Sequence, residues 1–315
     1  MSNTNTQKAL AITYKGGPFE LIRHAIPTPG PGEILVKIEG VGLNQSDWKY
    51  QTGVVDPSNF TAIDVGEGVT RLSKGDRVRA FLVELLGWIT AERTTFQEYT
   101  IVEAELTAKI PETLTALEAA SIPACISTAA MIFWASNLQG TGLKPFWEED
   151  AEGYYSGTSK SILSIGASSI TGLFALQIAR YLGLSSIITT SSLKHTEYLK
   201  SMGATHVIDR HTDIMAAVEK LKGEGIEFNF IFDAVHLVFN DGRRGVMATM
   251  GVDKELKKAV HARIKLLLEK GMLKAARVEK IGGGLGGIAE GLKKMERHEV
   301  SGVKLVVGPT ETPDS

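Results

Sequence analysis

The chain has 315 residues, of which 43% are hydrophobic and 22% charged, so its composition is that of a globular protein and excludes wholesale disorder or a fibrous architecture. Its 34 basic and 36 acidic residues give a net charge of −2, which provides no basic excess for binding nucleic acid or a membrane surface. A single cysteine, Cys125, excludes an intramolecular disulfide and a cysteine-rich zinc site.

Neither end of the chain predicts a secretory or membrane segment. The N-terminal MSNTNTQKAL has no apolar stretch of signal-peptide length, so we expect a cytoplasmic protein. Residues 119–143 carry no charge, but Pro123 and many polar residues interrupt them, and we expect a buried helix with loops there, with no membrane span. The polar C-terminal GPTETPDS is expected to be frayed.

The first third of the chain predicts a small, strand-rich domain. Short apolar runs predict strands over residues 9–14, 34–41, 77–81 and 98–102. Between the first two, IPTPGPGE contains three prolines and two glycines, which forbid regular structure. Further on, Thr115 and Glu118 form a T-x-x-E pattern that predicts a capping box at the start of a helix.

From residue 161 the chain alternates between strand-like and helix-like segments. Strands are predicted over 161–165, 186–190, 205–208 and 229–234, and helices over 170–182, 193–202 and 214–221. This order predicts an α/β fold with a parallel, doubly wound sheet. The remaining segments predict helices over 255–269 and 288–296 and strands over 275–281 and 303–307.

The segment SILSIGASSITG, residues 161–172, joins a predicted strand to a predicted helix. Its glycines permit a tight turn and close helix packing, and its small residues let backbone amides approach a phosphate at the helix N-terminus. We expect a dinucleotide pyrophosphate here, the alternative being a structural turn without a cofactor. The candidate binding residues are Gly166, Ala167, Ser168, Ser169 and Ile170.

The end of the following strand favours NADPH over NADH. An NAD site usually has an acidic residue there for the ribose hydroxyls, but this segment reads IITTSSLK and has none. Ser191 and Ser192 offer hydroxyl groups and Lys194 a positive charge, which suit a 2′-phosphate. Thr190, the residue before Ser191, is a further cofactor-binding candidate. The alternative for Lys194 is an ordinary solvated lysine.

Several stretches resemble the medium-chain dehydrogenase/reductase superfamily, and within it the fungal trans-acting enoyl reductases that partner polyketide synthases. They are GLNQSDWK (42–49), GEGVTRLSKGDRV (66–78), FQEY (96–99), the turn at 166–172, EYLKSMGATHVID (197–209) and SGVKLV (301–306). The resemblance implies a GroES-like β-rich substrate domain formed by residues 8–120 and 268–315. It also implies a Rossmann NADPH-binding domain formed by residues 121–267.

The resemblance further implies an NADPH-dependent enoyl reductase that transfers a hydride to an α,β-unsaturated polyketide thioester held by a synthase, in secondary metabolism. It implies two possible partners, the synthase or its carrier-bound acyl chain. It also implies that the protein is a monomer or a homodimer. Zinc-dependent relatives carry an early cysteine and a Gly-His-Glu segment, and this chain has neither, so we expect no metal. Any polarisation of a substrate carbonyl must then come from hydrogen-bond donors.

By the same resemblance, Asn44, Asp47 and Lys49 lie beside the nicotinamide, where Lys49 would protonate or orient the product enolate. Asp47 and Lys49 are alternatively a structural pair. Thr128 matches a threonine that faces the nicotinamide carboxamide, or else is a buried, backbone-bonded hydroxyl. Lys304 lies in the segment that matches a C-terminal strand which closes over the cofactor in the family. The alternative is that Lys304 is a solvated lysine.

Three departures from the family pattern bear on function. About ten residues of a glycine-rich strand are absent between Asn59 and Asp64, and the stretch from Asp233 to Ala259 is short. Arg210 stands where relatives often have an aromatic residue against the adenine; arginine stacks as well and pairs with a 2′-phosphate. The shortened segments keep two alternatives open: a quinone or enone reductase acting on free small molecules, and a non-redox member, which would be a silent subunit, an isomerase or a cyclase.

Overall fold

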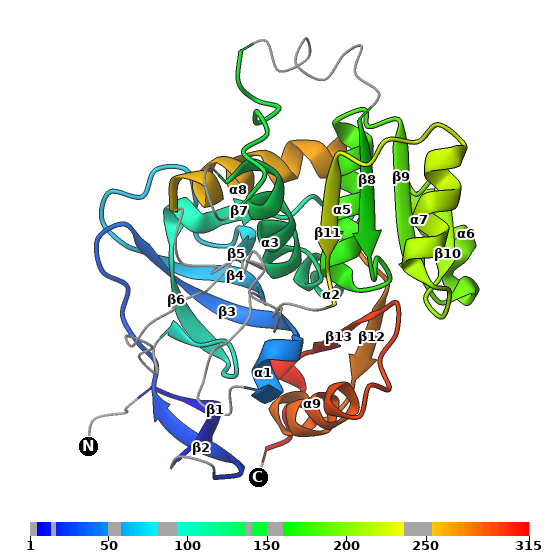
Figure 1. The fold of residues 1–315 in the computed structure, drawn as a ribbon. Helices are drawn as coiled ribbons and strands as arrows, with labels where there is room; N and C mark the ends of the chain where they lie inside the picture. Colours follow the sequence, from blue (N-terminus) through cyan, green and yellow to red (C-terminus); the bar gives the residue numbers. More distant parts are fainter. Residues whose placement is uncertain are drawn as a thin grey trace. The chain divides into compact units, whose positions relative to one another are not determined.

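The computed structural model describes residues 5–13, 17–49, 58–80, 93–135, 140–149, 160–235 and 254–314 (Figure 1). The chain forms two compact units. Unit 1 consists of Met1–Ala124, Met250–Glu269 and Ala275–Ser315, and unit 2 consists of Cys125–Thr249 and Lys270–Lys274. We describe each unit by itself.

Unit 1 is built on a sheet with the strand order β12-β13-β3-β4-β5-β7. Its strands are β3 (Glu33–Gly42), β4 (Ser58–Val65), β5 (Arg77–Ala80), β7 (Thr107–Lys109), β12 (Val278–Ile281) and β13 (Lys304–Val307). A further strand, β6 (Tyr99–Glu103), pairs antiparallel with β3, and β1 (Thr6–Ile12) forms an antiparallel pair with β2 (Phe19–Ala25). The central strand β3 therefore joins the N-terminal part of the unit to its C-terminal strand β13.

The core of unit 1 follows from strand and helix periodicity. Ile34, Val36 and Ile38 alternate along β3, lie on one face and are fully buried in the main cluster. Helix α9 (Ile288–Glu296) contributes Ile288, Leu292 and Met295 at helical spacing to the same cluster.

The other helical segments of unit 1 are mostly short. They are α1 (Gln45–Lys49), η2 (Ala104–Leu106), α2 (Ala116–Ala120), α8 (Lys254–Glu269), η4 (Gly284–Gly287) and η5 (Pro309–Glu311). The capping box at the start of α2 is confirmed: the Glu118 N–H donates to Thr115 Oγ1 at 3.2 Å, and the Thr115 N–H donates to Glu118 Oε2 at 2.9 Å.

The described part of the unit 1 sheet is continuous at residues 58–65, where we expect about ten residues of a glycine-rich strand to be absent. Strand β4 occupies residues 58–65 and pairs with both β3 and β5, so the shortened segment still forms the connecting strand. Register shifts along its pairing with β3 accompany this arrangement.

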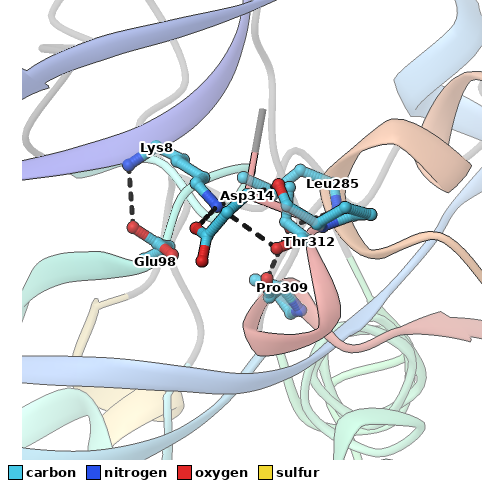
Figure 2. A network of polar contacts seen from close by, with 7 residues as sticks. Lys8, Glu98, Leu285, Pro309, Thr312 and Asp314 are labelled. Atoms are coloured by element: carbon cyan, nitrogen blue, oxygen red, sulfur yellow. Dashed lines mark hydrogen bonds and ion pairs between the residues drawn. The ribbon is translucent and has the colours of Figure 1, made fainter.

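The expectation of a frayed C-terminus is wrong, because hydrogen bonds from the buried Lys8 side chain and from Leu285 hold the segment (Figure 2). The Lys8 ammonium donates to Thr312 O at 3.2 Å, Pro313 O at 3.0 Å and Asp314 Oδ1 at 2.7 Å. The Leu285 N–H donates to Thr312 Oγ1 at 2.9 Å. The first strand of the unit is thereby tied to its last residues.

Unit 2 contains a parallel sheet with the strand order β10-β9-β8-β11. Its strands are β8 (Ser161–Ile165), β9 (Ser186–Ser191), β10 (His206–Asp209) and β11 (Phe230–Asp233), and its helices α5 (Ile170–Tyr181), η3 (Leu193–His195), α6 (Thr196–Met202) and α7 (Ile214–Gly223) connect them. Leu163 and Ile188 pack with Leu221 of α7. The predicted alternation of strands and helices is confirmed over the described residues 161–233.

The boundary between the units falls within α3 (Pro123–Trp134), close to the expected boundary at residue 121. The structure groups α8 with unit 1, whereas the expected second boundary at 268 puts that helix in the Rossmann domain. Contacts with β7 and η2, including an ion pair at 2.5 Å between Lys258 and Glu105, explain this grouping.

The charge-free region, residues 119–143, includes the end of α2 and the whole of α3. Within the described residues, Ala116–Trp134 is long and apolar enough to cross a membrane by length and composition, but 78% of its window is buried. A helix of 12 residues such as α3 rises only about 18 Å, well short of a bilayer core of about 30 Å.

Candidate functional site

The turn between β8 and α5 has the geometry of a phosphate-binding turn. Gly166 has φ +75°, a conformation that favours glycine. Its N–H donates to Thr190 O at 3.1 Å and to Thr190 Oγ1 at 3.0 Å, and the Ala167 N–H donates to Thr189 Oγ1 at 3.3 Å. The turn is thus fixed to the neighbouring strand β9.

The start of α5 leaves backbone donors for an anion. Ser169 is the N-cap, and its hydroxyl accepts from the Gly172 N–H at 3.2 Å. The N–H groups of Ile170 and Thr171 lie in the first turn of the helix, where the helix itself provides no carbonyl to accept from them. A Cβ on Gly172 would lie 2.6 Å from Ala167 Cα, so only glycine allows this close approach. These residues fit the pyrophosphate of a dinucleotide.

The strand order places this turn where α/β sheets bind ligands. The chain runs from β8 outward through β9 and β10, and then returns to β11 on the other side of β8. In such sheets, ligands bind beyond the carboxyl ends of the strands, at the point where the order reverses. The turn at 166–170 follows the carboxyl end of β8 at that point.

The candidates for the adenosine end of the cofactor are gathered at the neighbouring strand ends. Thr190 and Ser191 end β9 and are buried, and Lys194 follows in η3 with an exposed side chain. Arg210 follows β10, is exposed, and donates its backbone N–H to Ser191 O at 2.9 Å. Two hydroxyl-bearing and two cationic residues therefore lie at adjacent strand ends.

Two neighbours of Arg210 were not among the sequence candidates. The Arg210 Nε donates to His211 Nε2 at 3.2 Å, and the His211 N–H donates to Asp209 Oδ1 at 2.9 Å. Asp209 lies opposite Ser191 in the strand register. The predicted parallel pairing of β9 with β10 could have indicated these residues, because it places the residues that follow both strands at the same edge of the sheet.

In unit 1, the structure brings together Asn44 and Lys304, which are 260 residues apart in the chain. The Lys304 Nζ donates to Asn44 Oδ1, and the Asn44 N–H donates to Asp47 Oδ2 at 2.7 Å. Asp47 and Lys304 are buried and Asn44 is half-buried. The alternative of a solvated Lys304 is therefore wrong.

The remaining candidates are placed only in part. Lys49 is the last residue of α1, and its side chain lies outside the described residues, so its expected pairing with Asp47 stays a prediction. Thr128 lies on α3 and is half-buried. Of the short stretch from Asp233 to Ala259, residues 236–253 lie outside the described part of the chain.

Metal ligands are not clustered in the part of the chain that the structure describes: it contains no group of three or more His, Cys, Asp or Glu side chains placed to hold an ion. The described residues therefore provide no ligand set that fits a zinc ion.

Two family models match the chain. Residues 30–112 match the alcohol dehydrogenase GroES-like domain, and residues 171–271 match the zinc-binding dehydrogenase family. The first match lies in unit 1 and the second begins at the first turn of α5.

Curated relatives include two kinds of reductase. The trans-enoyl reductase gkaC of Penicillium citrinum is 28% identical, with 96% of this chain and 97% of that protein covered. Its alignment is 365 positions long and exceeds the 315 residues of the chain, so the relative has segments with no counterpart here. A chloroplastic quinone oxidoreductase QR1 of Triphysaria versicolor is 33% identical, over 67% of this chain and 63% of that protein.

Solved structures share the fold over nearly the whole chain. A putative zinc-dependent alcohol dehydrogenase protein from Rhizobium etli CFN 42 aligns with a TM-score of 0.77 at 20% identity, covering 96% of this chain and 98% of that one. The CurK enoyl reductase aligns with a TM-score of 0.71 at 17% identity, covering 96% and 99%. With its GroES-like part, its parallel Rossmann-type sheet and these relatives, the chain belongs to the medium-chain dehydrogenase/reductase superfamily and resembles its fungal trans-enoyl reductases.

Proposed function

We propose that the chain is an NADPH-dependent, zinc-independent enoyl reductase that reduces an α,β-unsaturated polyketide thioester in trans with a synthase. The observation that carries the proposal is the turn at Gly166–Ile170, which fits a dinucleotide pyrophosphate at the reversal point of the sheet. The names of the curated relatives support the substrate class, since gkaC of Penicillium citrinum and tazE of Aspergillus terreus are both called trans-enoyl reductases.

The choice of NADPH rests on the two cationic residues that follow β9 and β10, Lys194 and Arg210. No acidic residue ends β9, where a carboxylate would hold a ribose diol. Lys194 and Arg210 are both exposed and carry positive charge, and Arg210 is joined to Ser191 through its backbone. An arginine fork and a lysine ammonium are suited to a phosphate.

The proposed reaction moves two electrons and adds two hydrogens across the C=C bond. A reduced nicotinamide cofactor supplies a hydride when it is bound. The substrate accepts this hydride at its β-carbon, the π electrons move to the thioester oxygen to form an enolate, and the α-carbon then takes a proton. Asn44 would donate to the developing oxyanion, Lys49 would deliver or orient the proton, and Thr128 would hold the nicotinamide carboxamide.

NADPH oxidation in the presence of enoyl thioesters tests this proposal. We expect absorbance at 340 nm to fall with a short-chain enoyl thioester and the saturated thioester to accumulate in equal amount. A protein that binds NADPH but oxidises none with any thioester is not an enoyl reductase.

A second candidate is reduction of free quinones or enones, which the 33% identity to the Triphysaria versicolor quinone oxidoreductase supports. The same assay with free substrates separates the two, because each predicts the larger kcat/KM for its own class. Product formation without NADPH oxidation would instead indicate a non-redox member of the family.

A further inference from the structure

Asn44 is held from two sides by buried charged residues. Its side-chain oxygen accepts from the Lys304 ammonium, and its backbone N–H donates to the Asp47 carboxylate at 2.7 Å. The Asp47 N–H donates back to Asn44 O at 3.1 Å. Lys304 and Asp47 are 4% and 3% exposed, whereas Asn44 is half-buried, so Asn44 is the member of the group that reaches solvent-accessible space.

The bond from Lys304 determines which way the amide faces. An ammonium group only donates, so the oxygen of the Asn44 amide must face Lys304 and its NH₂ group must face the other way. None of the described residues accepts a hydrogen bond from Asn44 Nδ2. Two N–H donors are therefore presented on the side away from the lysine, already oriented.

The sheet brings Lys304 to this position. β13 pairs antiparallel with β3, with Val306 opposite Gly42, and Asn44 follows β3 by two residues. A Cβ on Gly42 would lie 2.9 Å from Lys304 Cε and 2.6 Å from Ala120 O. The absence of a side chain at Gly42 thus gives the lysine stem its room.

We propose that Lys304 is a positioning residue that orients the Asn44 amide, and that Asn44 Nδ2 donates to the carbonyl oxygen of the substrate thioester. This inference rests on the enoyl reductase function proposed above. As the hydride adds to the β-carbon, negative charge develops on that oxygen, and a preorganised donor stabilises it without reorganising. The ammonium on the far side of the amide polarises the donor and strengthens its bond.

Four variants test the pair kinetically: Lys304→Met, Lys304→Arg, Asn44→Ala, and the double variant of Lys304→Met with Asn44→Ala. Removing one oxyanion donor typically costs about 100-fold or more in kcat. We expect kcat at saturating NADPH to fall about 100-fold in Asn44→Ala and about 10-fold or more in Lys304→Met. We expect Lys304→Arg to restore part of it and the double variant to be no slower than Asn44→Ala. The Kd for NADPH should stay within about twofold throughout.

Lys8→Met is the matched control, because it removes another buried ammonium of unit 1, 5% exposed, that bonds to the C-terminal segment. We expect it to lower stability and leave kcat unchanged. An equal loss of kcat in Lys8→Met would show that Lys304 acts only through stability. A Kd for NADPH raised tenfold in Lys304→Met with kcat unchanged would make Lys304 a cofactor ligand. Losses that multiply in the double variant would show that the two residues act independently. Each of these three results overturns the proposal.

A second readout needs neither cofactor nor substrate. The chain has seven asparagines, so its side-chain amide signals can be resolved after selective ¹⁵N-asparagine labelling, and Asn44→Asp assigns one pair by its loss. We expect the chemical shifts of the two Asn44 amide signals to change in Lys304→Met and to stay the same in Lys8→Met. Unchanged chemical shifts in both variants would overturn the orienting role of Lys304. If the unaltered protein oxidises no NADPH with thioesters, the proposed function and the donor role fail, while the amide signal still decides whether Lys304 orients Asn44.

Discussion

Arg79 on β5 is a fully buried arginine without a hydrogen-bond partner for any of its three guanidinium nitrogens among the described residues. Burial lowers the pKa of this guanidinium to about 9. A buried, unpaired charge lowers the stability of the folded state, because water solvates it in the unfolded chain.

We therefore predict that Arg79→Met raises the free energy of unfolding by roughly 1–4 kcal/mol at pH 7. The folded-state pKa lies below the ordinary value of 12.5, so the unfolded state binds more protons between these values. The stability of the unaltered protein should then rise with pH above about 9, and the advantage of the variant should shrink. Urea unfolding at pH 7 and pH 10 measures both effects.

The neighbouring Arg77→Met is the control, since the Arg77 guanidinium donates to Leu114 O at 3.2 Å and its loss should be destabilising or neutral. A lower stability of Arg79→Met at both pH values would contradict the prediction and would show that the guanidinium has a stabilising partner.

At the scale of the element, the effect of Gly172→Ala on stability is predicted to be the opposite of what helix propensity alone implies. Replacing glycine by alanine inside a helix usually stabilises it by about 1 kcal/mol. In α5, a Cβ at Gly172 would approach Ala167 Cα to 2.6 Å and Gly166 O to 2.9 Å. We predict that Gly172→Ala lowers the free energy of unfolding by roughly 1–3 kcal/mol, as overpacking does.

Gly223, the last residue of α7, provides the matched control, because a Cβ at this residue would have nothing within 4 Å of it. Gly223→Ala should be neutral or slightly stabilising in the same urea titration. Equal effects of the two substitutions would mean that the turn has room for a side chain and that the close approach is not required.

The elements of unit 2 could be predicted from sequence because each has a clear period. In unit 2, β8 matches its predicted range residue for residue and α5 differs by one residue at its end; in unit 1, α9 also matches its predicted range. Strands β2, β4 and β7 could not be predicted in this way. β2 is mostly exposed and β7 has three residues, so neither shows a sustained apolar alternation.

The candidate site could be predicted only where its residues are close in sequence. The turn at 166–170 is contiguous, and Gly166 with the small residues that follow it identifies the turn directly. The bond between Asn44 and Lys304 spans 260 residues and depends on the pairing of β13 with β3, which no local pattern specifies. The contact of Arg210 with His211 likewise depends on side-chain placement beyond the end of β10.

At the scale of the whole chain, the C-terminal segment is tied to the first strand through Lys8. A chain that ends at Gly308 would leave this buried ammonium without its three oxygen partners. We predict that this truncation lowers the free energy of unfolding by roughly 3–5 kcal/mol, the usual cost of leaving a buried charge without its partners. Urea unfolding at pH 7 measures it.

Asp314→Asn is the control for that truncation, because Asp314 is 97% exposed and its ion pair with Lys8 is screened by solvent. It should change stability much less than the truncation does. The Lys8 ammonium holds the pKa of Asp314 below its ordinary value, so the contribution of the carboxylate should disappear as the pH falls through that lowered pKa. An unchanged unfolding midpoint of the truncated chain would show that the bonds from Lys8 to the C-terminal segment do not stabilise the fold.

The central claim is that the chain binds NADPH through unit 2, and a fluorescence titration of the purified protein with NADPH and NADH tests it most directly. We predict saturable NADPH binding, at least about tenfold tighter than NADH binding, with the preference lost in Lys194→Ala. That preference corresponds to about 1.4 kcal/mol of binding free energy. The absence of binding to either nucleotide would contradict the account and remove the basis for any redox function.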